Sequence, residues 1–249
     1  MFVQILLVIV ATLATVNAYS GVDLSVATTT ADWDCLVKQH NTTYTVIRTY
    51  RNIGAIDTNS ANSIRLAAEA GIKDIGVYIF PCVETSSYAV SHNVTCVSPE
   101  QQILDSVSYL AENKIVFKRS TEAVAKYPAD VVVLTRFWLD IEDETPSKYY
   151  DADPVKNQDL IGKIVGQLEK LHIPVGIYAT KTYWQNIMGN IEGYGKYPLW
   201  YSRYDGVDSF DFFVPFADFT EVKMKQTAGS SGFCSISQVD PDYREVENI

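Results

Sequence analysis

The sequence has few of the residues that build metal centres and redox sites. Only three of its 249 residues are histidine and only four are cysteine. His40, His92 and His172 lack the short spacing of a metal-binding motif, and no two cysteines form a CxxC pair. We therefore expect neither a bound metal nor a cofactor.

Motifs for nucleotide binding and for serine nucleophiles are also missing. The chain contains no GxGxxG fingerprint, no Walker loop and no GxSxG elbow. Basic side chains are outnumbered, with 20 Lys and Arg against 30 Asp and Glu and a formal charge of −10. An acidic protein repels phosphate groups, so this composition argues against nucleic acid as a partner.

The N-terminal segment resembles a secretory signal peptide. Its first 18 residues carry no charged side chain, an apolar run begins at Ile5, and Val16-Asn17-Ala18 fits a small-x-small cleavage site. A transmembrane anchor would need about 20 apolar residues, and threonine and asparagine interrupt this stretch. We therefore expect a signal peptide at 1–18, one domain at 19–249 and a secreted protein without a membrane span.

The four cysteines fit an oxidising environment. An even number without CxxC spacing favours disulfides over zinc, and four cysteines allow three pairings. We favour the pair Cys82–Cys96, which closes a local loop. The other pair, Cys35–Cys234, would tie the first predicted helix to the C-terminal region.

Two acceptors for N-linked glycans fit the same secretory route. Asn41 begins Asn-Thr-Thr and Asn93 begins Asn-Val-Thr. In a secreted protein both asparagines are candidates for glycan attachment, although chance matches to so short a motif are common.

Apolar periodicity predicts that strands and helices alternate along most of the chain. Strands are expected at 21–26, 44–50, 75–80, 131–142 and 174–179, and helices at 31–39, 60–70, 98–113, 154–168 and 180–188. Strand candidates at 199–204, 212–216, 222–226 and 235–239 follow without helices. About five βα units followed by β-strands alone indicate an α/β fold, a modified TIM-like barrel that antiparallel strands complete.

Two segments do not fit this alternation. Residues 81–98 are expected to form a loop that holds two of the cysteines. Residues 117–136 separate a helix from the next strand by far more than the usual connection of about 2–6 residues. That segment could contain an extra helix at 121–126, be a mobile insertion, or reflect an error in the coding sequence.

An acidic strand stands at the centre of the chemical interpretation. Side chains alternate between the two faces of a strand, so the odd positions from 137 to 141 give an apolar face. Trp138, Asp140 and Glu142 share the other face, with the Cα atoms of the two acids about 7 Å apart. Burying two unpaired carboxylates is costly, which favours a functional role over an exposed edge strand with alternating acids.

Paired carboxylates and aromatic rings are what glycoside hydrolysis requires. One carboxyl acts as the general acid and the other stabilises the oxocarbenium-like centre, and repulsion between them raises one pKa. Catalytic groups of such barrels gather at the carboxyl ends of the strands. The expected residues there, including aromatic rings on which sugars stack, are Asp23, Tyr78, Asp140, Glu142, Tyr178, Trp200, Tyr201 and Tyr204. A Ca²⁺ or Mg²⁺ site at Asp140, Glu142 and Asp143 is the alternative, but such ligands are usually spread through a loop.

A series of short motifs, in the same order as in a known family, runs through nearly the whole chain. They are Gly21-Val22-Asp23-Leu24-Ser25, Gly76-Val77-Tyr78-Ile79-Phe80-Pro81-Cys82, Trp138-Leu139-Asp140-Ile141-Glu142, Pro174-Val175-Gly176-Ile177-Tyr178, Pro198-Leu199-Trp200-Tyr201, Lys225-Gln226-Thr227-Ala228-Gly229 and Gln238-Val239-Asp240. Together they resemble the glycoside hydrolase family 25 lysozymes of the Chalaropsis type, and within these the nematode and amoeba lysozyme-like branch.

This resemblance implies a barrel of five βα units that β-strands complete. It implies hydrolysis of the β-1,4 bond between N-acetylmuramic acid and N-acetylglucosamine in bacterial peptidoglycan. Glu142 would be the general acid and Asp140 its partner, with Asp23 and Asp240 as further carboxylates in the cleft. Further residues expected to line the groove are Tyr78, Tyr178, Trp200, Tyr201 and Gln226.

Several alternatives stay open at this point. The carboxylates could act directly or through the acetamido group of the substrate, and a glycosidase acting on chitin is not excluded. A catalytically weak or inactive relative could instead bind wall glycan or a host partner, because 117–136 and the polar stretch 201–205 depart from the family pattern. We expect a secreted monomer that serves antibacterial defence or the digestion of bacteria.

Overall fold

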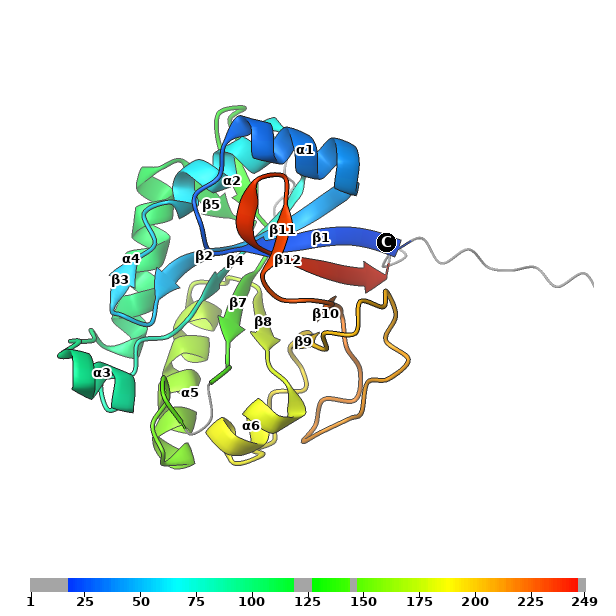
Figure 1. Ribbon diagram of the computed structural model, residues 1–249. Coiled ribbons are helices and arrows are strands. Elements are labelled where there is room, and N and C mark those ends of the chain that lie inside the picture. The colour runs from blue at the N-terminus through cyan, green and yellow to red at the C-terminus, as the bar shows by residue number, and fades with distance from the viewer. Residues whose placement is uncertain (1–17, 119–126, 144–146, 246–249) are drawn as a thin grey trace, which may run out of the picture.

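A closed barrel of eight strands forms the centre of the molecule (Figure 1). The computed structural model describes residues 18–118, 127–143 and 147–245. Strand β1 pairs with both β2 and β12, and this double pairing closes the barrel. Around the barrel the strands are β1 (Ala18–Leu24), β2 (Thr42–Arg51), β4 (Asp74–Ile79), β7 (Phe137–Asp140), β8 (Val175–Tyr178), β9 (Leu199–Ser202), β10 (Met224–Gln226) and β12 (Ile236–Glu245).

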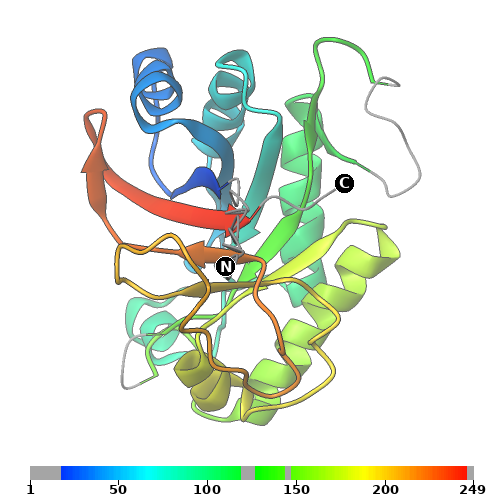
Figure 2. The same ribbon diagram turned by 90° about the vertical axis from the view of Figure 1, so that its right-hand side faces the viewer.

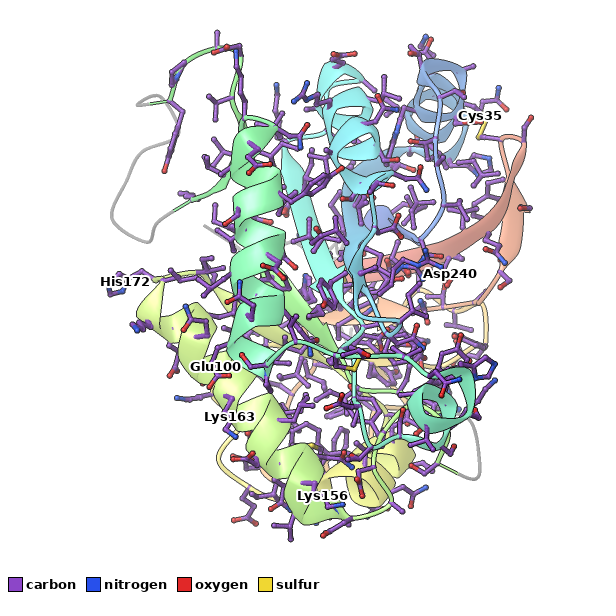
Figure 3. The ribbon with its side chains drawn as sticks, turned by 90° about the vertical axis from the view of Figure 1, so that its left-hand side faces the viewer. Cys35, Glu100, Lys156, Lys163, His172 and Asp240 are labelled. Carbon is purple, nitrogen blue, oxygen red and sulfur yellow. A yellow bond between two sulfur atoms is a disulfide. The ribbon has the colours of Figure 1, made fainter. Side chains whose placement is uncertain are left out.

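Helices cover the outside of the first five βα units, as predicted. They are α1 (Thr30–His40), α2 (Ser60–Glu69), α4 (Pro99–Glu112), α5 (Pro154–Lys170) and α6 (Lys181–Met188). The expected caps are present: Ser98 accepts from Gln101 N–H at the start of α4, and Asp153 accepts from Val155 N–H at the start of α5. Figure 3 shows α4 meeting α5 near Glu100 and Lys163.

Alternation along the strands separates an inner and an outer core. A buried cluster inside the barrel comes only from its strands: Tyr44, Val46, Tyr78, Trp138, Tyr178, Trp200 and Met224. On β7 the apolar partners Phe137 and Leu139 belong instead to the outer core beneath the helices. The predicted two faces of the acidic strand are therefore confirmed.

The antiparallel part of the barrel begins later than expected. Strands β9 and β10 run parallel to β8, and only β12 is antiparallel to its neighbours β1 and β10. Strand β11 (Ser231–Phe233) forms a hairpin with β12. The predicted strand at 212–216 is wrong, since this stretch forms only an isolated bridge between Phe216 and Phe219. Phe213 and Phe216 of this stretch pack in the outer core of the barrel, whereas Phe212 is exposed.

The predicted strand at 131–142 is two separate strands. Val132–Leu134 forms β6, which pairs in parallel with β5 (Ile115–Phe117) in a second, two-stranded sheet. The backbone breaks between β6 and β7 because Thr135 N–H donates to Ile75 O of β4. The possible extra helix at 121–126 lies outside the described residues.

The segment 81–98 is not simply a loop, because it contains the short helix α3 (Ser87–His92). Ser86 caps this helix by accepting from Ala89 N–H. A two-residue strand, β3 (Ala55–Ile56), also pairs with the end of β2. Both elements are too short for apolar periodicity to reveal.

Both predicted disulfides are confirmed. Cys82 pairs with Cys96, and Cys35 of α1 pairs with Cys234 in the turn between β11 and β12. His40 lies beside the second pair, but its two cysteine neighbours are already bonded to each other. Within the described ranges, this is the only cluster of three histidine, cysteine or acidic side chains close enough together to hold a metal ion.

None of the described helices is both long and apolar enough to cross a membrane. The predicted signal peptide at 1–18 falls outside the described residues apart from Ala18, which begins β1. It therefore stays a prediction.

Candidate active site

A cavity opens at the carboxyl ends of the parallel strands, with an empty volume of about 320 Å³. Barrel strands supply most of the wall, and loops after β7 and β9 supply the rest. The lining residues are Asp23, Tyr78, Asp140, Glu142, Tyr178, Trp200, Tyr204, Gln226 and Asp240.

The amide of Gln226 connects both sides of this cavity. Its Nε2 donates to Asp23 Oδ2 at 2.6 Å and to Asp240 Oδ2 at 3.2 Å. Its Oε1 accepts from the hydroxyls of Tyr178 at 2.8 Å and Tyr204 at 2.9 Å. Every donor and acceptor of the amide is therefore used, and one side chain fixes four others.

Three aspartates of β1 and β12 gather beside Gln226. Burial raises the pKa of Asp23, the nearby carboxyls of Asp242 and Asp240 raise it further, and the hydrogen bond from Gln226 opposes them. Burial likewise raises the pKa of Asp240, against a hydrogen bond from Ser230 N–H. A carboxyl whose pKa is raised this way holds its proton at a higher pH than an ordinary aspartate.

Asp242 is a buried carboxyl that the sequence analysis missed. It is 3% exposed and accepts from Trp200 Nε1 at 2.9 Å. Burial is again the first cause that raises its pKa. The signal for it was present, because Asp240 and Asp242 are two residues apart and so share one face of β12, but the predicted strand ended at Val239.

Asp140 and Glu142 share the cavity, although the strand that carries them ends sooner than expected. Strand β7 ends at Asp140, and Glu142 follows in the loop. Asp140 is 6% exposed, and its pKa is raised by burial and then by the charge of Glu142, with Arg48 opposing. A neighbouring negative charge disfavours ionisation of a buried carboxyl, so the charge of Glu142 helps Asp140 to keep its proton.

Asp143 organises the loop behind these acids. Its carboxylate accepts from the backbone N–H groups of Lys148, Tyr149 and Tyr150 at 2.8–3.0 Å. The hydroxyl of Tyr150 then donates to Asp140 O at 2.6 Å. The carboxylate is thus engaged by the protein backbone, which argues against the alternative of a cation site at this place.

Aromatic rings form the floor of the cavity. Trp200 makes edge-to-face contacts with Tyr178, Trp138 and Tyr78, with ring centroids 4.6, 5.7 and 6.4 Å apart. Gly176 on β8 leaves the space for Trp138, because any Cβ atom there would overlap the indole ring. The rings of the floor are therefore buried and closely packed against one another.

The prediction that Tyr201 lines the groove is wrong. Trp200 points inward, so its neighbour points outward, and Tyr201 packs against Phe213 in the outer core with ring centroids 5.4 Å apart. Tyr204 lies in the cavity wall instead. The nine other residues predicted for the cleft all lie together: Asp23, Tyr78, Asp140, Glu142, Tyr178, Trp200, Tyr204, Gln226 and Asp240.

The two glycosylation candidates have the same backbone position. Asn41 and Asn93 are the left-handed C-caps of α1 and α3, each with φ of 51°, and both are exposed. Their exposure suits glycan attachment, which stays a prediction.

Comparison with known proteins decides the family. The family model described as "Lysozyme-like protein 1" matches residues 14–120 and 117–227. "Probable GH family 25 lysozyme 5" of Dictyostelium discoideum is 34% identical over 229 residues, which are 92% of this chain and 91% of that relative. The chain belongs to the glycoside hydrolase family 25 lysozymes. It is therefore a glycoside hydrolase of the muramidase type.

Solved structures that superimpose on this GH25 lysozyme have the same fold. The bacterial lysozyme of Streptomyces coelicolor superimposes with a TM-score of 0.63 at 20% identity, over 90% of both chains. The modular autolysin LytC of Streptococcus pneumoniae, solved with a synthetic peptidoglycan ligand, gives 0.58 at 15% identity, over 90% of this chain and 46% of that one. The modified barrel predicted from the sequence is confirmed.

Proposed function

We propose that this lysozyme hydrolyses the β-1,4 bond between N-acetylmuramic acid and N-acetylglucosamine in bacterial peptidoglycan. The supporting observation is the cavity in which Asp140 and Glu142 face Asp23 above an aromatic floor. Carboxyls at this position and rings for sugar stacking are what glycoside hydrolysis needs. The peptidoglycan ligand of LytC supports the choice of substrate.

In this proposal Glu142 carries a proton and is the general acid. Glu142 donates it to the glycosidic oxygen as the bond from that oxygen to the anomeric carbon breaks. The negative charge of ionised Asp140 stabilises the positive charge that develops at the anomeric carbon. Water then adds to that carbon through its oxygen, and its released proton restores the protonated form of Glu142.

Two routes fit this set of residues. In the first, a carboxylate stabilises or attacks the anomeric carbon directly, and in the second the acetamido group of the substrate attacks it. In the second route Asp140 orients the acetamido group. NMR of the first-formed anomer, combined with substrates that lack the acetamido carbonyl, distinguishes the two.

We also propose that the protein acts outside the cell, in antibacterial defence or in digestion of bacteria. The predicted signal peptide and the two disulfides support secretion. A monomer suffices for this function, because one chain supplies the whole lining of the cavity.

The test is the release of reducing ends from purified peptidoglycan between pH 4 and pH 7. We expect activity in the wild type, at least a hundredfold loss in Glu142→Gln, and full activity in the control Glu192→Gln, whose side chain is exposed. Chitin serves as a parallel substrate. If neither glycan is cleaved but peptidoglycan still sediments the protein, the chain is a lysozyme-like binding protein instead.

A further inference from the structure

Lys225 is a fully buried lysine on β10. Its side chain is 0% exposed. The neighbouring Met224 and Gln226 face the barrel interior, whereas Lys225 extends toward the loop that follows β9. Its Nζ donates to Asp205 Oδ1 at 2.6 Å, to Val207 O at 2.8 Å and to Ser209 O at 3.3 Å. All three ammonium hydrogens are thus used, as burial of a charge requires.

The same loop is joined to β10 by its backbone. Arg203 N–H donates to Gln226 O at 3.0 Å, and Gly206 N–H donates to Thr227 O at 3.1 Å. Asp205 also accepts from Arg203 Nε at 2.8 Å and from Val207 N–H at 3.0 Å. The loop, gold to orange in Figure 2, is therefore anchored where it leaves the cavity.

Tyr204 lies on the other side of this anchor. Its hydroxyl donates to Gln226 Oε1 at 2.9 Å, and its ring lies against Gly229, where a Cβ atom would come within 3.0 Å. Two adjacent residues of β10, Lys225 and Gln226, thus hold two adjacent residues of the loop, Asp205 and Tyr204. Lys225 holds the loop from outside the barrel, and Gln226 holds it from inside.

The ring of Tyr204 is fixed but open to a ligand. It is 61% exposed although it lines the cavity. A tyrosine hydroxyl with its ordinary pKa of about 10 is protonated between pH 4 and pH 7, so this hydroxyl keeps its donor role toward Gln226. An exposed ring with a fixed polar tip offers an apolar face to a sugar at little cost in side-chain entropy.

We propose that Tyr204 is a substrate-binding residue that stacks on a sugar ring beside the scissile bond, and that Lys225 and Asp205 are positioning residues that set its place. The inference rests on the proposed hydrolysis of a glycan. It adds a recognition element to that site, from a polar stretch that departs from the family pattern.

The experiment compares KM and kcat on soluble peptidoglycan fragments. We expect Tyr204→Ala to raise KM about tenfold, the size of one aromatic contact, and Tyr204→Phe to raise it less because the ring remains. Lys225→Met and the milder Asp205→Asn should raise KM more than they change kcat. Lys223→Met, on the same segment but exposed, is the matched control and should match the wild type.

A double-mutant cycle separates positioning from general destabilisation. In the Tyr204→Ala background, Asp205→Asn and Lys225→Met should raise KM no further. The inference is overturned if Tyr204→Ala leaves KM within twofold of the wild type. It is also overturned if the increase in KM of the double variant equals the product of the increases of Tyr204→Ala and of the positioning substitution. A wild type without activity contradicts the proposed function instead, and the same cycle is then measured as the fraction of protein bound to insoluble peptidoglycan.

Discussion

Gln226 donates a hydrogen bond of 2.6 Å to Asp23, a residue 203 positions earlier in the chain. The bond joins β10 to β1 across the interior of the barrel. It also places the carboxylate of Asp23 among the hydroxyls and carboxyls that line the cavity. The geometry of the site thus depends on an amide that itself does no proton transfer.

Replacing that amide should damage both stability and activity. Gln226→Leu leaves Asp23 and the hydroxyls of Tyr178 and Tyr204 without their partner, and an unsatisfied buried polar group costs about 1–3 kcal/mol. We expect the free energy of unfolding in urea to fall by about that amount and kcat to fall at least tenfold. Gln238→Leu, an exposed position on β12, is the control. Wild-type kinetics in Gln226→Leu would contradict the role given to the amide.

The buried acids should make the protein more stable in mild acid than at neutral pH. Asp23, Asp140 and Asp242 have raised pKa values, chiefly through burial. The folded state therefore binds more protons than the unfolded state above about pH 4, and stability falls as pH rises toward the folded pKa values. We expect a higher melting temperature at pH 5 than at pH 7.5.

The Asp242→Asn variant tests the cause of this trend. Asparagine can still accept from Trp200 Nε1 but does not titrate, so the melting temperature should vary less with pH. Asp208→Asn, at an exposed position, should show the same change of melting temperature with pH as the wild type. Carboxyls with lowered pKa values, such as Glu169 beside Tyr197 and Lys196, act in the opposite direction but only below about pH 4. A melting temperature that rises between pH 5 and pH 7.5 would refute the argument.

Replacing Gly176 and Gly166 by alanine should change the stability of the protein in opposite directions. A Cβ atom at Gly176 overlaps the ring of Trp138, and overpacking of this kind costs about 1–3 kcal/mol. Gly166 lies exposed in α5 with nothing near its missing Cβ, so alanine there should stabilise the helix by about 0.5–1 kcal/mol. Urea denaturation of the two variants measures both effects. If both variants change the free energy of unfolding equally and in the same direction, the overlap with Trp138 does not determine the stability of Gly176→Ala.

The disulfide between Cys35 and Cys234 should matter more for stability than the other. It joins residues 199 positions apart, whereas Cys82 and Cys96 are 14 apart. A longer closed loop restricts the unfolded chain more, and losing a native disulfide typically costs about 2–5 kcal/mol. We expect the Cys35→Ser/Cys234→Ser double variant to melt below the Cys82→Ser/Cys96→Ser variant. If the Cys82→Ser/Cys96→Ser variant melts at the lower temperature instead, restriction of the unfolded chain is not the main source of the stabilisation.

Local patterns in the sequence were enough to predict the barrel and much of its site. Strict alternation placed Trp138 and Asp140 on the inner face of β7, and helix caps such as Ser98 marked where helices begin. The same rule should have turned Tyr201 outward once Trp200 was placed inside. The family motif contains both aromatics and does not distinguish the inward ring from the outward one.

Other features depend on contacts that no local pattern reveals. The break between β6 and β7 arises because Thr135 bonds to β4, about 60 residues away. The partnership of Gln226 with Asp23 appears only when the barrel closes. The loop after β9 uses aromatic side chains to cover the barrel, and its composition resembles a strand although it forms none.

Closure of the barrel also has a consequence for folding kinetics. Asp23 and Asp240 are directly opposite each other in the pairing of β1 with β12, so one wall of the site joins residues from the two ends of the fold. Contacts so distant in sequence form slowly and late, since the chain must first lose the entropy of closing the loop. A refolding chain should recover helical signal well before it recovers hydrolysis, and the return of enzyme activity would then time the final closure.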